Sequence, residues 1–116
     1  MKKYALGIDV LFLLLFVGVG RNAHQHGITL AGMASTTWPF AVGLLGGWLT
    51  VTRARRAPTT PTSGMVIVLV TVALGMVLRV VSGQGTAFAF VIVALVFLSL
   101  FLVGWRAAAA LISRRG

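Results

Sequence analysis

Four long apolar runs make up most of the sequence, and they constrain the fold more than any other feature. They cover about residues 4–20, 28–51, 64–82 and 86–112. A helix rises about 1.5 Å per residue, so about 20 residues span the ~30 Å hydrocarbon core of a bilayer. Lipid admits only helices or closed barrels, and these runs lack the alternating pattern of barrel strands. We therefore predict an all-α integral membrane protein with four transmembrane helices.

The composition excludes an ordinary soluble domain. Of the 116 residues, 59% are hydrophobic and only 9% are charged, whereas about a quarter of the residues in a soluble domain are charged. The chain contains no cysteine, so disulfides and thiolate metal sites are excluded. The links between the runs are short, which predicts a single domain over residues 1–116, folded as an up-down-up-down bundle.

The net charge of +9 is concentrated at the ends of the apolar runs. This distribution is typical of topology signals and of contacts with anionic lipids, whereas nucleic-acid binding requires a dense basic patch on a soluble module. Arg21 and Arg79 fall on one side of the predicted bundle. The positive-inside rule then predicts a plasma-membrane protein with both termini in the cytoplasm. The other eight of the ten Lys and Arg share the opposite side: Lys2, Lys3, Arg53, Arg55, Arg56, Arg106, Arg114 and Arg115.

Asp9 is the only acidic residue in the chain, and an unpaired carboxylate inside lipid is costly. It lies six residues after Lys3, about 9 Å inward along a helix. Arg106 lies eight residues before Arg114, about 12 Å inward from the same side. We predict that Asp9 and Arg106 form a structural ion pair across the first and fourth helices. The alternatives are a substrate or cation site at Asp9, or an unpaired and neutral Asp9.

A second polar group is predicted at the opposite side of the bundle, formed by Arg21, His24 and Arg79. Two guanidinium groups without an acidic neighbour suit an anion such as a lipid phosphate or a carboxylated ligand. The preferred interpretation is nevertheless that both arginines extend into the headgroup layer or cap helix carbonyls without a dedicated ligand, and a defined anion or lipid site is the alternative. His24 and His26 do not share a helical face, so we expect neither a metal site nor haem, and no cofactor.

The second apolar run has features of a helix that packs against protein. Pro39 frees a carbonyl one turn back, which is tolerated where a membrane helix faces protein or a cavity. Gly43 and Gly47 have the spacing that allows two helices to approach closely. We predict a packing kink, with a ligand cavity as the alternative. Trp48 and Trp105 are expected to be interfacial anchors. The predicted kink and packing residues are Pro39, Phe40, Gly43, Gly47 and Gly75.

The same residues resemble a family pattern. The chain is similar to the bacterial and archaeal membrane family known as domain of unknown function 3054, over roughly residues 7–107. The resemblance implies a small multi-helix membrane protein, commonly of actinobacterial type, with no assigned activity, substrate or cofactor. It is carried by the order and spacing of Asp9, Gly20-Arg21 with His24, Pro39-Phe40, Gly75 with Arg79, Phe88 and Gly104-Trp105-Arg106.

The sequence lacks the parts of a catalytic site, since it has one carboxylate, no cysteine and no acid near either histidine. We therefore expect no enzyme, but a non-catalytic interaction or accessory subunit of a larger membrane complex or homo-oligomer, in contact with anionic lipids. The first alternative is an oligomeric small-solute transporter or channel with Asp9 or the Arg21/Arg79 pair in its pathway. The second alternative is a lipid or quinone binder.

Overall fold

The computed structural model describes residues 2–23, 30–84 and 88–115, without the side chains of residues 2–3, 21–23 and 114–115. These residues form four helices, which confirms the predicted all-helical class. They are α1 (Lys2–Ala23), α2 (Leu30–Arg53), α3 (Pro61–Val81) and a fourth helix that is continuous from Phe88 to Arg115. The fourth helix consists of α4 (Phe88–Leu98), the π-helical turn η1 (Ser99–Val103) and α5 (Gly104–Arg115).

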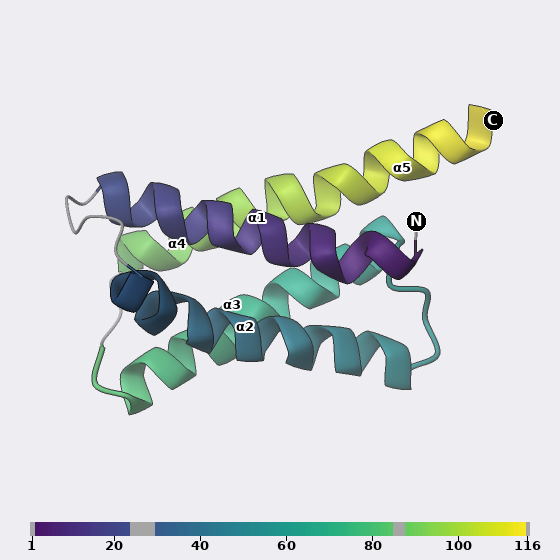
Figure 1. Ribbon diagram of the computed structural model, residues 1–116. Coiled ribbons are helices and arrows are strands. Elements are labelled where there is room, and N and C mark those ends of the chain that lie inside the picture. The colour runs from purple at the N-terminus through teal and green to yellow at the C-terminus, as the bar shows by residue number, and fades with distance from the viewer. Residues whose placement is uncertain (1, 24–29, 85–87, 116) are drawn as a thin grey trace.

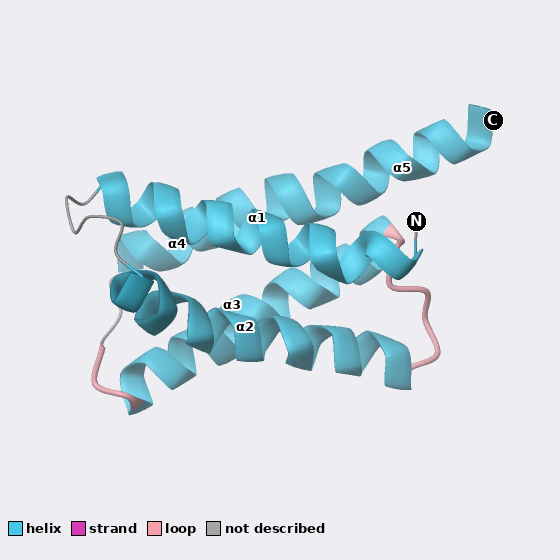
Figure 2. Cartoon of the chain, in the orientation of Figure 1, coloured by secondary structure: helices cyan, strands magenta, loops and turns pink. Residues whose placement is uncertain are grey.

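Successive helices run in opposite directions and form a bundle (Figures 1 and 2). α1 lies beside the fourth helix, and α2 lies beside α3. The two marked chain ends and the loop between α2 and α3 are found at the same end of the bundle (Figure 1). We call this end the terminal end, and the other the distal end. At the terminal end α5 extends beyond its neighbours.

The helix boundaries differ from the predicted ones by a few residues, and capping explains the clearest case. α3 begins at Pro61 and not near residue 64. Thr60 is extended, and its hydroxyl accepts a hydrogen bond from the Ser63 backbone N–H at 3.2 Å. Proline is favoured at the first helical position because its missing N–H would have no helical acceptor there. The polar residues before the apolar run therefore form the first turn of the helix.

α2 and α3 are in close contact because glycines line the face of α2 that meets α3. A Cβ on Gly43 would lie 2.6 Å from the Thr71 carbonyl oxygen, and one on Gly47 would lie 2.9 Å from the Ile67 Cα. On α3, a Cβ on Gly75 would meet the Phe40 ring at 2.6 Å. Side chains at these positions would separate the two backbones, so the small residues permit the contact.

Pro39 is buried inside α2 and does not end the helix. Figure 1 shows the first turns of α2 at an angle to the rest of that helix. Phe40, which follows, is fully buried and packs edge-to-face on Phe16 of α1 and on Phe90 of α4, with ring centroids 5.9 Å apart in both pairs. Such pairs add to the stabilisation given by apolar burial. Phe16 also contacts Phe97, at 5.4 Å, so aromatic rings join three of the four helices in the core.

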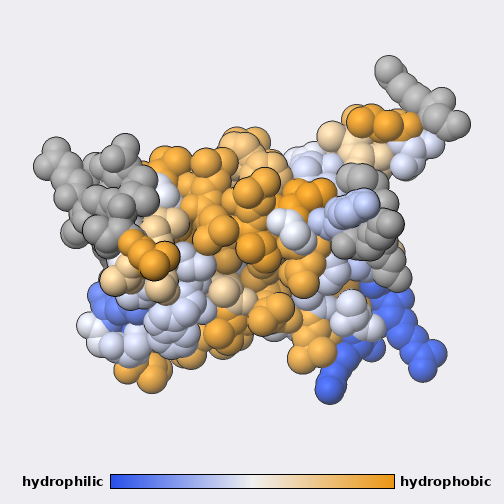
Figure 3. Space-filling view, in the orientation of Figure 1, coloured by the Kyte–Doolittle hydropathy of each residue, from blue (hydrophilic) through white to orange (hydrophobic). Residues whose placement is uncertain are grey.

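The lateral surface of the bundle is apolar. Figure 3 shows hydrophobic surface across the middle of the visible face, with hydrophilic surface gathered toward the two ends. Leu11, Leu45, Leu69 and Val96, one from each helix, are all more than half exposed. Among the described residues, two helices are long and apolar enough to cross a membrane, Pro61–Val81 and Phe88–Ser113. Tyr4–Gly20 is a shorter apolar helix.

Candidate functional site

Asp9 and Arg106 form a buried ion pair near the terminal end. Arg106 Nη1 donates to Asp9 Oδ1 at 2.8 Å, and Arg106 Nη2 donates to Asp9 Oδ2 at 2.6 Å. Both side chains are completely buried. Two parallel hydrogen bonds fix the orientation of the groups as well as their distance. The structure thus brings together the two residues that the sequence analysis paired, although they are 97 positions apart.

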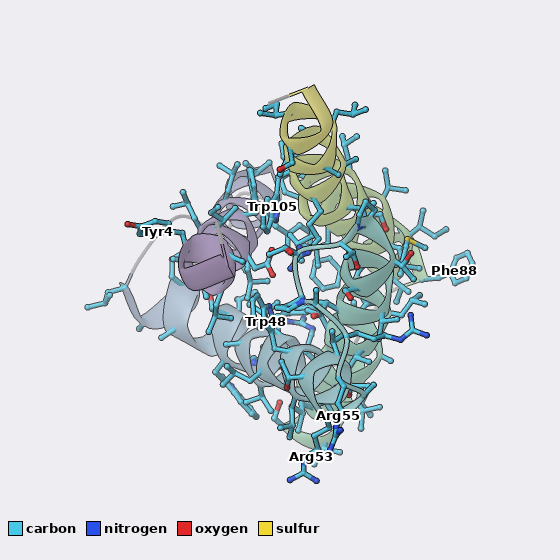
Figure 4. The ribbon with its side chains drawn as sticks, turned by 90° about the vertical axis from the view of Figure 1, so that its right-hand side faces the viewer. Tyr4, Trp48, Arg53, Arg55, Phe88 and Trp105 are labelled. Carbon is cyan, nitrogen blue, oxygen red and sulfur yellow. The ribbon has the colours of Figure 1, made fainter. Side chains whose placement is uncertain are left out.

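Two tryptophans donate to the same carboxylate. Trp105 Nε1 lies 2.9 Å from Asp9 Oδ1, and Trp48 Nε1 lies 2.8 Å from Asp9 Oδ2. The guanidinium carbon of Arg106 is 4.6 Å from the centroid of the Trp105 ring, a cation–π distance. Figure 4 shows both indoles reaching toward the middle of the bundle, whereas Arg53 points away from it. The sequence predicts interfacial anchors at Trp48 and Trp105 but not their hydrogen bonds to Asp9. The depth of a residue along a helix does not reveal the direction in which its ring points.

Arg106 also donates hydrogen bonds to two backbone carbonyls. Its Nε donates to the Pro58 oxygen at 2.7 Å, and its Nη1 donates to the Leu102 oxygen at 2.9 Å. Pro58 belongs to the loop between α2 and α3, so the guanidinium group connects that loop to α5 and to α1. Gly64 makes room for the side chain, since a Cβ there would lie 2.8 Å from Arg106 Cδ.

The π-helical turn Ser99–Val103 directly precedes this part of the site. In a regular α-helix, residues eight positions apart differ by about 80° around the axis. A π turn holds more residues and removes most of that difference. Leu98, Leu102 and Arg106 are accordingly all buried on one inward face. The turn therefore directs Arg106 toward Asp9.

We call Asp9, Trp48, Trp105 and Arg106 the Asp9 cluster, and its carboxylate is saturated. Each oxygen accepts two hydrogen bonds, which fills the roughly four lone-pair sites of a carboxylate. In this arrangement Asp9 has no position left for a metal ion or a substrate cation. Across the described residues, no group of three or more His, Cys, Asp or Glu is placed to hold a metal. The arrangement joins α1, α2 and α5 through one carboxylate.

A family model described as a protein of unknown function (DUF3054) matches residues 6–109. The chain belongs to the DUF3054 family. The predicted resemblance is thereby confirmed, and the matched span includes every residue of the Asp9 cluster. Neither a search of curated proteins nor a search of solved structures found a match to the chain.

At the distal end of the DUF3054 protein, Arg79 is held within the chain. Its guanidinium carbon lies 5.1 Å from the centroid of the Phe90 ring, and its Nη1 donates to Gln84 Oε1 at 3.2 Å. The alternative interpretation, an anion or lipid-headgroup site, combines Arg79 with Arg21 and His24. The Arg21 side chain and all of His24 lie outside the described residues, so the structure places only Arg79 of the three.

Gln84 of the DUF3054 protein also caps the carbonyl that Pro39 leaves without a donor. A helical N–H at position 39 would bond the carbonyl of Ser35, four residues earlier, but proline has no N–H. Gln84 Nε2 donates to the Ser35 oxygen at 3.1 Å, across 49 positions of sequence. The sequence predicts the freed carbonyl but not its donor, Gln84. The glutamine between glycines in the 82–86 turn was the available signal.

Proposed function

We propose that this DUF3054 protein is a multi-pass protein of the plasma membrane, with four membrane-crossing helices and both termini in the cytoplasm. The longest dimension of the chain, which includes the part of α5 that extends beyond its neighbours, is 44 Å, close to the ~40–45 Å thickness of a bilayer with its headgroups. Most of the fourth helix is not covered by the rest of the chain, unlike the core helix of a soluble protein. α2 packs along α3, so the two helices share the same depth. The arginine-rich loop at the terminal end supports a cytoplasmic position for that end.

Within the membrane, we infer that the protein acts as a non-catalytic interaction or accessory subunit. The observation that carries this inference is the saturation of the single acidic side chain by four donors. An oligomeric transporter that uses Asp9 would have to remove Arg106 and both indoles in every cycle. Burial makes an uncompensated charge costly, so such a cycle has a high barrier. The remaining large feature is apolar lateral surface, which lipid and the helices of other subunits can cover.

The orientation is tested with a reporter fused after Gly116 and a second one inserted in the 82–86 turn. After Gly116, we expect activity from a reporter that works only in the cytoplasm. In the 82–86 turn, we expect activity from a reporter that works only after export. An exported reporter after Gly116 would contradict the proposed orientation.

The function is tested by purifying the full chain from its native membrane in mild detergent at native expression level. We expect a partner protein at a fixed molar ratio that is unchanged in a second detergent. A self-contained species without a partner in both detergents would contradict the subunit role. Proton or cation flux in liposomes that is lost in Asp9→Asn, measured on protein that remains folded, would favour transport instead.

A further inference from the structure

The loop between α2 and α3 presents three arginines at the terminal end. Arg53, Arg55 and Arg56 are all exposed, and Figure 4 shows Arg53 and Arg55 pointing outward from the same edge of the bundle. They are three of the ten basic residues in the chain, gathered within four positions. The Asp9 cluster uses none of the three.

The backbone beneath these arginines is fixed by hydrogen bonds. The Arg56 N–H donates to the Val51 oxygen at 3.1 Å, and the Arg55 N–H donates to the Thr52 oxygen at 3.0 Å. This pattern ends α2 in the manner of a Schellman motif. Further along the loop, the Pro58 oxygen accepts from the buried Arg106. The guanidinium groups are therefore carried on a backbone held at both ends.

Arg55 occupies a conformation that suits glycine better. Its φ is 60°, and it is the only described non-glycine residue with a positive φ. Glycine is the usual residue at this position of a helix end, because a side chain there is strained. An arginine at this position adds a third positive charge to the loop but strains its backbone.

The surroundings of the loop indicate what the charges contact. Leu45 and Leu49 of α2 are more than half exposed, and with Arg53 they share one helical face at four-residue spacing. On α3, Met65 and Leu69 are exposed beside the same end. The apolar residues Leu45 and Leu49, followed by the guanidinium group of Arg53, match a lipid whose acyl chain ends in a phosphate headgroup. A soluble anion would contact the guanidinium group but not the apolar residues.

We propose that Arg53, Arg55 and Arg56 form a preformed binding site for the phosphate headgroup of anionic lipids. The inference rests on the proposed function, since it requires a membrane-embedded chain, and it adds a defined lipid site to it. Arginine binds phosphate through its planar donors. The strained Arg55 is retained because its charge completes the site.

The test is a lipid titration of the full purified chain in neutral detergent, followed by native mass spectrometry. Phosphatidylglycerol is compared with phosphatidylcholine of identical acyl chains. We expect R53Q/R55Q/R56Q to weaken phosphatidylglycerol binding by about tenfold or more, given the usual contribution of each basic residue near an anionic lipid. The matched control is K2Q/K3Q/R114Q, which removes the same net charge elsewhere and should change binding less than about twofold.

A second variant, Arg55→Gly, separates binding from folding. Its unfolding midpoint should equal or exceed that of the wild type, while its phosphatidylglycerol affinity falls. A lowered midpoint would overturn the strain argument, and equal losses in the two triple variants would overturn the defined site. Binding of inorganic phosphate at the same affinity would assign the site to soluble anions. Because binding is measured in detergent, these results are independent of the reporter test of orientation.

Discussion

At the scale of single residues, the Asp9–Arg106 pair is better understood as a device for specificity than as a source of stability. Removing two charges from water costs several kcal/mol each, and their attraction roughly offsets this cost. The two indoles donate to the carboxylate lone pairs that Arg106 does not use, and two backbone carbonyls accept from the Arg106 N–H groups that Asp9 does not use. A misassembled bundle would leave a buried charge unpaired, so the pair selects one arrangement of α1, α2 and α5.

Breaking the pair from one side should therefore be costly. We expect Asp9→Asn and Arg106→Gln each to lower the free energy of unfolding by about 3–5 kcal/mol, because each leaves one buried charge uncompensated. The double variant should lose less than the sum of the two single losses, by about 0.5–3 kcal/mol. Unfolding in detergent can be followed by tryptophan fluorescence, because Trp48 and Trp105 lose residue 9 as their hydrogen-bond acceptor when the protein unfolds. Strictly additive losses would contradict the pairing.

The sequence allowed the pair to be predicted but not its tryptophan partners. Depth along a helix follows from counting residues, so Asp9 and Arg106 could be matched at about the same depth. The direction of a side chain depends on helix rotation, which the nearly uniform apolar faces leave undetermined. The π-helical turn in particular shifts the face of α5, and no residue in Ser99–Val103 signals it.

At the scale of elements, the contact between α2 and α3 depends on backbone proximity. We expect Gly43→Ala to lower the free energy of unfolding by about 1–3 kcal/mol, because the new Cβ would overlap the Thr71 carbonyl at 2.6 Å. The matched control is Gly46→Ala, whose Cβ would meet side-chain methyl groups and no backbone, Leu74 Cδ2 at 3.2 Å and Val70 Cγ1 at 3.6 Å. Thermal unfolding in detergent compares the two. A loss for Gly46→Ala as large as that for Gly43→Ala would contradict the packing argument.

The bond from Gln84 to Ser35 links the α3–α4 turn to the proline in α2, and the two should be coupled. We expect Gln84→Ala to cost about 0.5–1.5 kcal/mol, the usual net value of one hydrogen bond. In a Pro39→Ala background the cost should be smaller, because the alanine N–H can bond the Ser35 carbonyl itself. Thermal unfolding of the wild type, Gln84→Ala, Pro39→Ala and the double variant gives the coupling free energy between the two positions. Gln84 Nε2 also donates to Ser82 Oγ at 3.3 Å, so an equal cost in both backgrounds would show that Gln84 acts through Ser82 or Arg79 instead.

At the scale of the whole molecule, the helices and their number followed from hydropathy, since the length of an apolar run is nearly sufficient to specify a helix in lipid. The packing glycines of α2 also followed from their spacing. The role of the lateral surface did not, because an exposed leucine or valine suits contact with lipid and contact with another protein equally well. The face used in the proposed subunit role depends on a surface outside this chain.

The joining of positions 9 and 106 has a consequence for how the protein is made. In the membrane topology proposed above, α1 enters the bilayer with its carboxylate long before the ribosome reaches the arginine that pairs with it. Until then the nascent bundle carries an uncompensated charge among apolar helices. We therefore expect a chain that stops short of α5 to be less stable in the membrane than the full chain, because its carboxylate has no partner.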